Sequence, residues 1–178
     1  MGKKILIGCA VIIGLLFASA MVLVVLVGIG IESGHIPDIE IATGKTLTAK
    51  HREVAREAVP FAEDERLEWL YGAGLFKYEE DLQFMTTHRL VVVWTDATEG
   101  VQSFELDRDA IGRVDVKETA TDFTDGTTWV YGLDDEEWIQ LTLSAEKRLD
   151  EWVIEELREL AETNRAAQAE ATPAGDGD

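Results

Sequence analysis

Three histidines are the first side chains in this sequence that could take part in catalysis: His35, His51 and His88. None has the His-Glu-x-x-His spacing of zinc proteases, and the chain has neither a Gly-x-Ser-x-Gly nucleophile turn nor a Walker-type phosphate loop. His88 precedes Arg89 at an expected turn between two strands, which favours a role as a turn residue. We therefore expect no enzymatic activity and assign no catalytic residue.

Two clusters of acidic side chains supply the oxygen atoms that calcium prefers. Asp122 and Asp125 form the first cluster, and Asp134 to Glu137 form the second. Neither follows the Asp-x-Asp-x-Asp-Gly spacing of an EF-hand, and both fall where hairpin turns favour Asp and Gly. The single cysteine, Cys9, excludes an intrachain disulfide and a zinc cluster built from cysteines. The sequence thus predicts hydrated turns, no metal site and no cofactor.

Aromatic and apolar side chains are the candidates for binding a partner. The five tryptophans are expected mainly to fill a small core. Trp138, however, ends an acidic loop, and Leu75 and Phe76 stand between glycines and charged residues, next to Lys77. Exposed aromatic anchors of this kind often bind other proteins. We assign Leu75, Phe76, Lys77 and Trp138 as possible partner-binding residues.

Charge is distributed very unevenly along the 178 residues, because all 35 acidic side chains follow Ile31. Without Lys3 and Lys4, 14 basic residues stand against those 35 acidic ones, which leaves a net charge of −21. So acidic a surface repels phosphate backbones and anionic headgroups. This composition excludes nucleic acid as a partner.

The amino-terminal segment from Ile5 to Ile31 contains no charged residue. As a helix it would span about 40 Å, more than the ~30 Å hydrocarbon core of a bilayer. Ala18-Ser19-Ala20 resembles a signal-peptidase site, but the apolar run continues well past it. Leu6 to Cys9 resembles a lipobox, but too few apolar residues precede the cysteine. We predict a single-pass transmembrane helix over 5–31 in the cell membrane.

The side of the membrane on which the rest of the chain lies follows from the positively charged residues near the span. Lys3 and Lys4 favour a cytoplasmic amino terminus, which would place the acidic domain on the non-cytoplasmic side. Lys45, Lys50 and Arg52 act against this bias.

Behind the span, residues 32–60 are expected to be a spacer that ends in a juxtamembrane helix, capped by Thr48 and closed by Pro60. An antiparallel sandwich or barrel of short strands, closed by an amphipathic helix from Ser144 to about Glu162, should then form a domain over 61–163. Residues 164–178 are expected to be a disordered acidic tail. The expected strands are 66–72, 82–86, 89–95, 101–106, 112–118, 127–133 and 137–143.

Three segments of this domain resemble bacterial pleckstrin-homology-like (PH-like) domains. Tyr71 to Asp81 is similar to their first hairpin, Phe84 to Val92 to their "F-x-T-x-x-R-[LV]-[VI]" strand pair, and Phe104 to Ile111 to a later strand and turn. The resemblance implies an α+β fold, a PH-like antiparallel β-barrel capped by a C-terminal helix. It also implies that Thr87 and Arg89 flank a tight hairpin, and that Ile111 plugs the barrel.

In lipid-binding members of that family, the first hairpin loop carries a basic cluster for phosphoinositides. Here the loop offers Lys77 alone, followed by Glu79, Glu80 and Asp81, so specific phosphoinositide binding is not expected.

Taken together, the sequence predicts a membrane-anchored, non-catalytic module that tethers a protein partner, in a groove beside the last helix or at an exposed sheet edge. A lipid- or small-ligand-binding barrel is the first alternative, which an internal cavity would favour. A hydrolase is the second, which a cluster of His88 with two carboxylates would favour. An apolar surface strip over a solid core would favour the tethering module.

Overall fold

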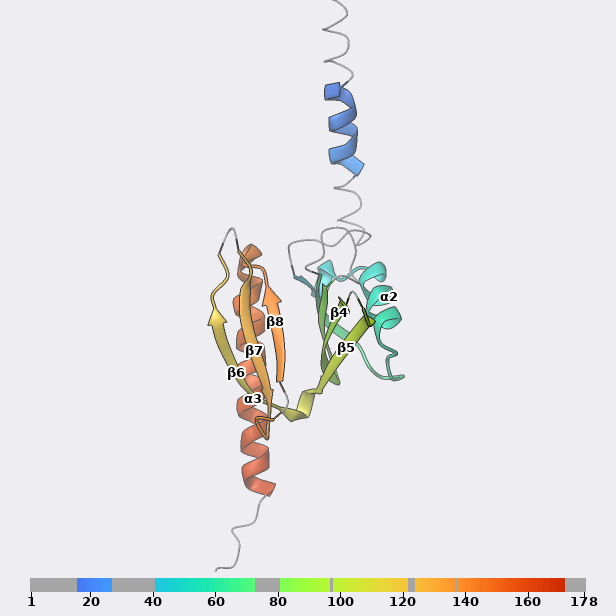
Figure 1. The fold of residues 1–178 in the computed structure, drawn as a ribbon. Helices are drawn as coiled ribbons and strands as arrows, with labels where there is room; N and C mark the ends of the chain where they lie inside the picture. Colours follow the sequence, from blue (N-terminus) through green and yellow to red (C-terminus); the bar gives the residue numbers. More distant parts are fainter. Residues whose placement is uncertain are drawn as a thin grey trace, which may run out of the picture.

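Two antiparallel sheets make up the β-structure in the described part of this chain. The computed structural model describes residues 16–26, 41–72, 81–96, 98–121, 124–136 and 138–171. The first sheet has the order β1-β2-β3-β4-β5, and the second has the order β6-β7-β8 (Figure 1). The strands are β1 (Ala42–Thr43), β2 (Leu67–Gly72), β3 (Asp81–Thr86), β4 (Arg89–Asp96), β5 (Gly100–Asp107), β6 (Ile111–Glu118), β7 (Gly126–Gly132) and β8 (Trp138–Leu143).

All seven strands predicted from turn spacing and alternation are present within one or two residues of their expected bounds. The prediction of a closed barrel is wrong, because β5 and β8 are the end strands of two separate sheets in the described part of the chain. A 3-10 turn at Arg108–Ala110 separates β5 from β6 and begins the second sheet. The fold is therefore α+β, with two antiparallel sheets and a C-terminal helix.

The main core lies between the two sheets. Trp69 and Met85 from the first sheet meet Val130 and Leu141 from the second, and all four are buried. Ile111, at the start of β6, is completely buried in the same core, which lies between two sheets and not inside the closed barrel that it was expected to plug. Because alternate residues of a strand face opposite sides, only every second side chain of each strand enters this core.

A second core lies on the outer face of the first sheet. The helix α2 (Ala49–Ala58) lies against the side of this sheet that is remote from the second sheet (Figure 1). Thr48 caps the helix by accepting the backbone N–H of His51 at 3.2 Å. The buried residues of α2 and its flanks pack against those of the sheet: Ala42, Leu47, Ala55, Val59, Leu70, Leu82, Phe84, Val91 and Val93.

The helix predicted after Thr48 is thus confirmed, but the described part of the predicted spacer belongs to the folded domain. Ile41 is fully buried in the main core, and β1 pairs with β2. The sequence predicted α2 to be part of a spacer outside the domain. Its narrow apolar stripe instead covers the outer face of the first sheet. Residues 27–40 lie outside the described residues.

A buried ion pair joins the start of β4 to the loop before β2. The guanidinium of Arg89 donates to both carboxylate oxygens of Glu65, each at 2.9 Å, and the Glu65 side chain is only 1% exposed. The hydroxyl of Thr86 donates to Glu65 and accepts the backbone N–H of Arg89. Thr86 and Arg89 therefore flank the β3–β4 hairpin, whereas Thr87, which we expected there, lies in the turn itself and bonds the backbone of Arg66.

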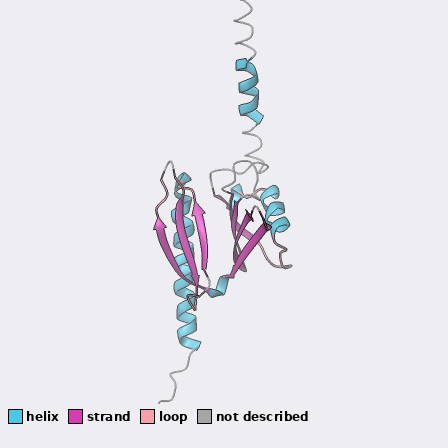
Figure 2. Cartoon of the chain, in the orientation of Figure 1, coloured by secondary structure: helices cyan, strands magenta, loops and turns pink. Residues whose placement is uncertain are grey.

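The helix α3 (Leu149–Ala171) covers the main core with Val153, Leu157 and Ala161. It begins after a 3-10 turn, Glu146–Arg148, in which Lys147 and Arg148 have positive φ. It also continues past Glu162, beyond the strands of the second sheet (Figure 2). The prediction of disorder from residue 164 is therefore wrong as far as Ala171, and residues 172–178 lie outside the described residues.

Tertiary hydrogen bonds explain why the helix is longer than predicted. The side-chain amide of Asn164 donates to the backbone carbonyls of Arg108 and Ile111, at 2.8 and 2.9 Å. Arg165 donates to the carbonyl of Gly112. The carbonyl of Arg108 lies in the connection between the two sheets, and those of Ile111 and Gly112 lie at the start of β6, so α3 holds the end of that connection in place.

Of the predicted transmembrane segment, residues 16–26 are described, and they form a helix whose side chains are all exposed. No helix in the described part of the chain is both long and apolar enough to cross a membrane. Residues 5–15 and 27–31 of the predicted span lie outside the described residues.

We predict that Glu65→Gln lowers the free energy of unfolding by about 2–4 kcal/mol, because it leaves the Arg89 guanidinium without its buried counter-charge. Urea denaturation of the full chain in detergent measures this loss. Glu105→Gln is the matched control, because Glu105 contacts the same guanidinium but its side chain is 35% exposed, and we expect a loss below about 1 kcal/mol. Equal losses for the two variants would contradict the assignment.

The same ion pair predicts a dependence of stability on pH. Burial alone would raise the pKa of Glu65, but hydrogen bonds from Arg89, the Ala62 backbone and Thr86 outweigh it and hold the pKa below its ordinary value of 4.5. The stabilisation is therefore complete above pH 4.5 and is lost as the pH falls through the lowered pKa of the folded state. The difference in stability between wild type and Glu65→Gln should shrink over that acid range.

Asn164→Ala should lower the free energy of unfolding by about 1–2 kcal/mol, because the part-buried backbone carbonyls of Arg108 and Ile111 lose their donor. Thr163→Ala is the control: its hydroxyl bonds only the preceding turn of its own helix, so we expect a change within about 0.5 kcal/mol. Thermal unfolding followed by circular dichroism compares the two variants. An unchanged stability of Asn164→Ala would show that the end of α3 does not hold the connection between the sheets.

Candidate functional site

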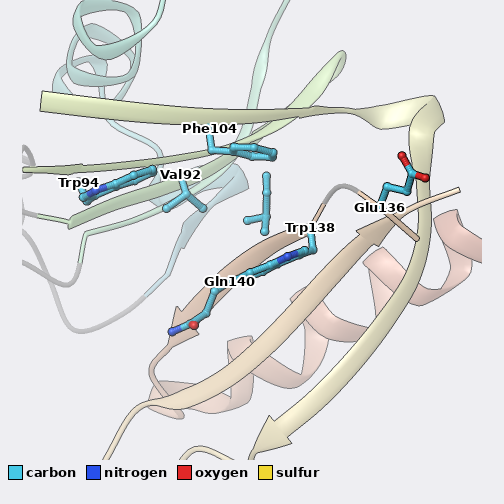
Figure 3. A pocket seen from close by; sticks show the side chains of 7 residues that line it. Val92, Trp94, Phe104, Glu136, Trp138 and Gln140 are labelled. Atoms are coloured by element: carbon cyan, nitrogen blue, oxygen red, sulfur yellow. The ribbon is translucent and has the colours of Figure 1, made fainter. Parts of the chain in front are cut away.

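An open, apolar cleft lies between the two sheets, where β4 and β5 face β8. Its volume is about 540 Å³, and Figure 3 shows the aromatic rings of the first sheet on one side and Trp138 on the other. We call it the aromatic cleft, and its lining residues are Val92, Trp94, Phe104, Glu136, Trp138, Ile139 and Gln140.

The alternation of β4 places its part of the lining. Leu90, Val92 and Trp94 share one face of the strand. Leu90 is fully buried between the sheets, Val92 is half-buried, and Trp94 is 41% exposed. Phe104, which pairs with Val92 across the β4–β5 ladder, is 37% exposed. The face that forms the core near Leu90 therefore continues uncovered into the cleft.

Trp138, the first residue of β8, forms the opposite wall. Its ring stacks on Trp129 with the centroids 4.9 Å apart and the planes at 20°, and it is 47% exposed. Lys117 lies 5.1 Å over the Trp129 ring, which adds a cation–π contact on the outer face of the second sheet. Trp138 is thus held in one orientation while much of its surface stays open to a ligand.

Both strands beside the aromatic cleft are end strands of their sheets in the described part of the chain. The backbone N–H of Thr142 in β8 points away from β7 and donates to the side chain of Gln83 at 2.9 Å. Alternate residues of a strand direct their backbone groups to the same side, so Gln140 directs its own toward the cleft. Such an edge can accept an added strand.

The charge around the aromatic cleft is negative. Glu136 is its one charged lining residue. Glu99 precedes β5 and Asp107 is its last residue, and β5 and β8 contain no basic residue. Glu105, in β5, contacts Arg89 on the outer side of the sheet. Across this surface, a cationic ligand is favoured over an anionic one.

One of the four predicted partner-binding residues, Trp138, lines the aromatic cleft. Leu75, Phe76 and Lys77 lie outside the described residues. Sequence reasoning did not single out Trp94 and Phe104, because strand alternation placed both on a face that reads as core. Trp94 and Phe104 are exposed because the second sheet does not extend far enough to cover them.

The predicted catalytic alternative is tested by the surroundings of His88. Its Nε2 lies 3.5 Å from the Asp64 carboxylate, and Glu63 lines the same shallow surface pocket. The side chains of His88 and Asp64 are 40% and 82% exposed. Because both side chains are exposed, packing does not fix the imidazole in one orientation for proton transfer.

The acidic clusters take part in turn and side-chain hydrogen bonds. Tyr71 donates its hydroxyl to Asp125 at 3.1 Å, and burial together with this carboxylate raises the Tyr71 pKa well above its ordinary value. Asp134 accepts the backbone N–H of Glu136 within a turn. No group of three or more acidic, histidine or cysteine side chains in the described ranges is placed to hold a metal ion. Asp122 and Glu137 lie outside those ranges.

No family model matches this sequence, and no curated protein matches it. Among solved structures, the chain is similar to a DUF1696 family protein with a pleckstrin-homology domain from Shewanella loihica, at 14% identity and a TM-score of 0.44, over 64% of this chain and 92% of that one. It is also similar to a pleckstrin homology domain from Shewanella amazonensis, at 18% identity and a TM-score of 0.46, over 62% and 86% of the two chains.

Proposed function

We propose that this chain is a membrane-anchored, non-catalytic PH-like module that holds an extended segment of a protein partner in the aromatic cleft. The single observation that carries the proposal is the cleft itself, with three exposed aromatic rings beside two open strand edges. A monomer seldom exposes Trp94, Phe104 and Trp138 together without a ligand, since contiguous apolar patches usually mark binding sites.

An extended peptide fits this geometry better than a helix does. A strand added to the edge of β5 or β8 would bond backbone groups that have no strand partner in the described part of the chain, and its alternate side chains would enter the cleft. Large apolar side chains would supply affinity against Trp138 and Phe104.

The negative charge of the domain favours basic residues in the partner segment that binds the cleft. With a net charge of −21 after the first 31 residues and Glu136 in the lining, the module favours a partner with Lys or Arg between its apolar anchors. We therefore commit to an extended segment in which apolar and basic residues alternate.

Attachment to a membrane is the second half of the proposal. Its support is the uncharged run over residues 5–31, which is long enough to cross a bilayer as a helix. An anchored module meets a partner of the same membrane at a raised effective concentration, so modest affinity in the cleft suffices for tethering.

A small apolar ligand is the second candidate for the aromatic cleft. A volume of about 540 Å³ lies within the range of small-molecule pockets. The open strand edges favour the peptide, because a small ligand would leave them unpaired.

We predict that nine-residue peptides of alternating apolar and basic residues bind the full chain in nanodiscs, and that Trp138→Ser and Phe104→Ser each weaken the binding by roughly 10- to 30-fold. Fluorescence anisotropy of labelled peptides measures the affinity. Val101→Ser is the matched control, because Val101 is an exposed apolar residue of the same strand as Phe104, but it lies on the other face of β5 and does not line the aromatic cleft.

Methylation of alternate peptide amides should abolish binding, because it removes the donors that an added strand needs. If the cleft variants bind as tightly as wild type, the peptide proposal fails. If the peptides do not bind, but a small apolar dye binds wild type and not Phe104→Ser, the small-ligand alternative replaces it.

The anchor predicts that the chain stays with the membrane pellet after alkaline carbonate extraction. Leu23→Arg combined with Val24→Arg should release it, because each arginine near the centre of a span costs about 2.5–3.5 kcal/mol. Thr98→Arg combined with Glu99→Arg is the control on an exposed loop and should leave the chain in the pellet. Recovery of the wild-type chain in the supernatant would refute the anchor and leave the cleft proposal standing.

A further inference from the structure

The aromatic cleft meets the two sheets in different ways. From the first sheet it is lined by Val92, Trp94 and Phe104, whose side chains share one face of β4 and β5. From the second sheet it is lined by three consecutive residues of β8, 138–140. Consecutive residues of a strand point to opposite faces, so the cleft borders a face of the first sheet but the free edge of β8.

The backbone groups at this edge of β8 are open to a partner. The N–H of Thr142 points away from β7 and donates to Gln83. Trp138 and Gln140 are alternate residues of the same strand, so their N–H and carbonyl groups also point away from β7. An added strand can therefore exchange hydrogen bonds with these two residues, as far as the contact between Gln83 and Thr142.

The free edge of β5 does not border the cleft in this way. The N–H of Arg108 bonds the carbonyl of His88, just before β4. Alternate residues back along β5 share this direction, so Phe104 directs its backbone groups to β4. Ser103 and Glu105 therefore direct theirs to the free edge, and neither lines the aromatic cleft. A strand that fills the cleft is thus better placed to pair with β8.

The outer face of the second sheet indicates which side chain would lie beside Trp138. Across the sheet, Arg113 of β6 is opposite Tyr131 of β7, which is opposite Trp138 of β8. The guanidinium carbon of Arg113 lies 4.0 Å from the centre of the Tyr131 ring, and the Lys117 ammonium lies 5.1 Å from that of Trp129. Each of these two rings of β7 is thus covered by a basic side chain from the neighbouring strand.

Trp138 has room for a similar cation on its other side. Trp129 stacks on one face of its indole, so the exposed 47% of Trp138 lies on the other face and the ring edges. Glu136 lines the same cleft and makes no ion pair with a described residue, whereas Asp135 in the same turn pairs with Arg113 at 3.2 Å. An open ring face and an unpaired carboxylate together fit a basic side chain.

We propose that the partner segment pairs with the edge of β8 and places an arginine over the open face of Trp138, with its guanidinium bound by Glu136. The inference rests on the proposed function, because it assigns the edge and one side chain of the segment proposed there. Residues opposite each other across a ladder share a face, so the arginine opposite Trp138 points outward. Its neighbours in the segment then point inward, onto Val92 and Phe104. The two faces of β8 thus account for a partner in which apolar and basic residues alternate.

Arginine suits this place better than lysine does. Its planar guanidinium stacks flat on an aromatic ring, donates two parallel hydrogen bonds to a carboxylate, and is less strongly hydrated than an ammonium group. Its aliphatic stem also contacts apolar surface.

The first test uses nine-residue peptides with apolar residues at alternate positions and threonine between them, which differ only at the central residue. This residue is arginine, lysine or citrulline, the neutral planar analogue of arginine. Fluorescence anisotropy with the full chain in nanodiscs measures the affinities. We expect the arginine peptide to bind roughly 3- to 10-fold more tightly than the lysine peptide, and about 10-fold or more above the citrulline peptide.

Glu136→Gln should reduce the advantage of arginine over citrulline to less than about threefold, because the bidentate charge contact is lost. Glu99→Gln is the matched control. It removes the same charge from an exposed residue that does not line the cleft, and we expect the advantage to change by less than about twofold.

The second test identifies the edge. Gln140→Pro removes an N–H from the free edge of β8 and should weaken the arginine peptide about 10-fold, whereas Ser103→Pro, its counterpart on β5, should change the affinity less than about twofold. NMR on the wild-type chain gives the same answer without a variant, because binding should shift the backbone amide signal of Gln140 and not that of Ser103.

The inference is overturned if the three peptides bind equally, if Glu136→Gln keeps the full preference, or if the amide of Ser103 shifts in place of that of Gln140. It is also overturned if none of these peptides binds while peptides of alternating apolar and basic residues do, and the proposed function then stands without it. Only the failure of both sets of peptides removes the two proposals together.

Discussion

The unequal size of the two sheets is the constraint on which the rest of this structure depends. The inner face of the first sheet is apolar along β4, from Leu90 through Val92 to Trp94, but among the described residues the second sheet has three strands with which to cover it. Where cover is complete, the side chains form a dry core. Where it ends, the same alternation leaves aromatic rings in an open cleft. Core and candidate site are thus two stretches of one continuous apolar face.

Polar interactions hold the elements that frame this face. The Glu65–Arg89 pair ties the β3–β4 hairpin to the loop before β2, and Gln83 bonds the backbone of β8 across the gap between the sheets. Asn164 ties α3 to the connection between the sheets. Because buried polar groups that lose their partners are costly, the bonds of Gln83 and Asn164 favour one relative placement of the sheets. That placement sets the width of the aromatic cleft.

Local patterns predicted most of the elements, since they depend on neighbouring residues. Alternation and turn residues placed β2 to β8, the Thr48 cap placed α2, and the stripe of Val153 and Leu157 placed α3. The candidate site was predicted only through Trp138, because an exposed aromatic at the end of an acidic loop is visible in the sequence. Trp94 and Phe104 were not, because a strand residue that faces a core and one that faces a cleft have the same pattern.

The sequence by itself determined the uncharged amino-terminal run, the strong acidity of the remainder, and the order of seven strands and a final helix. Tertiary structure alone decided that the strands form two sheets instead of a closed barrel, that residues 41–60 join the fold, and that α3 continues to Ala171. The physical reason is that each of these outcomes depends on partners far apart in the chain. Asn164 stabilises its helix through carbonyls more than fifty residues earlier, and no local pattern contains that information.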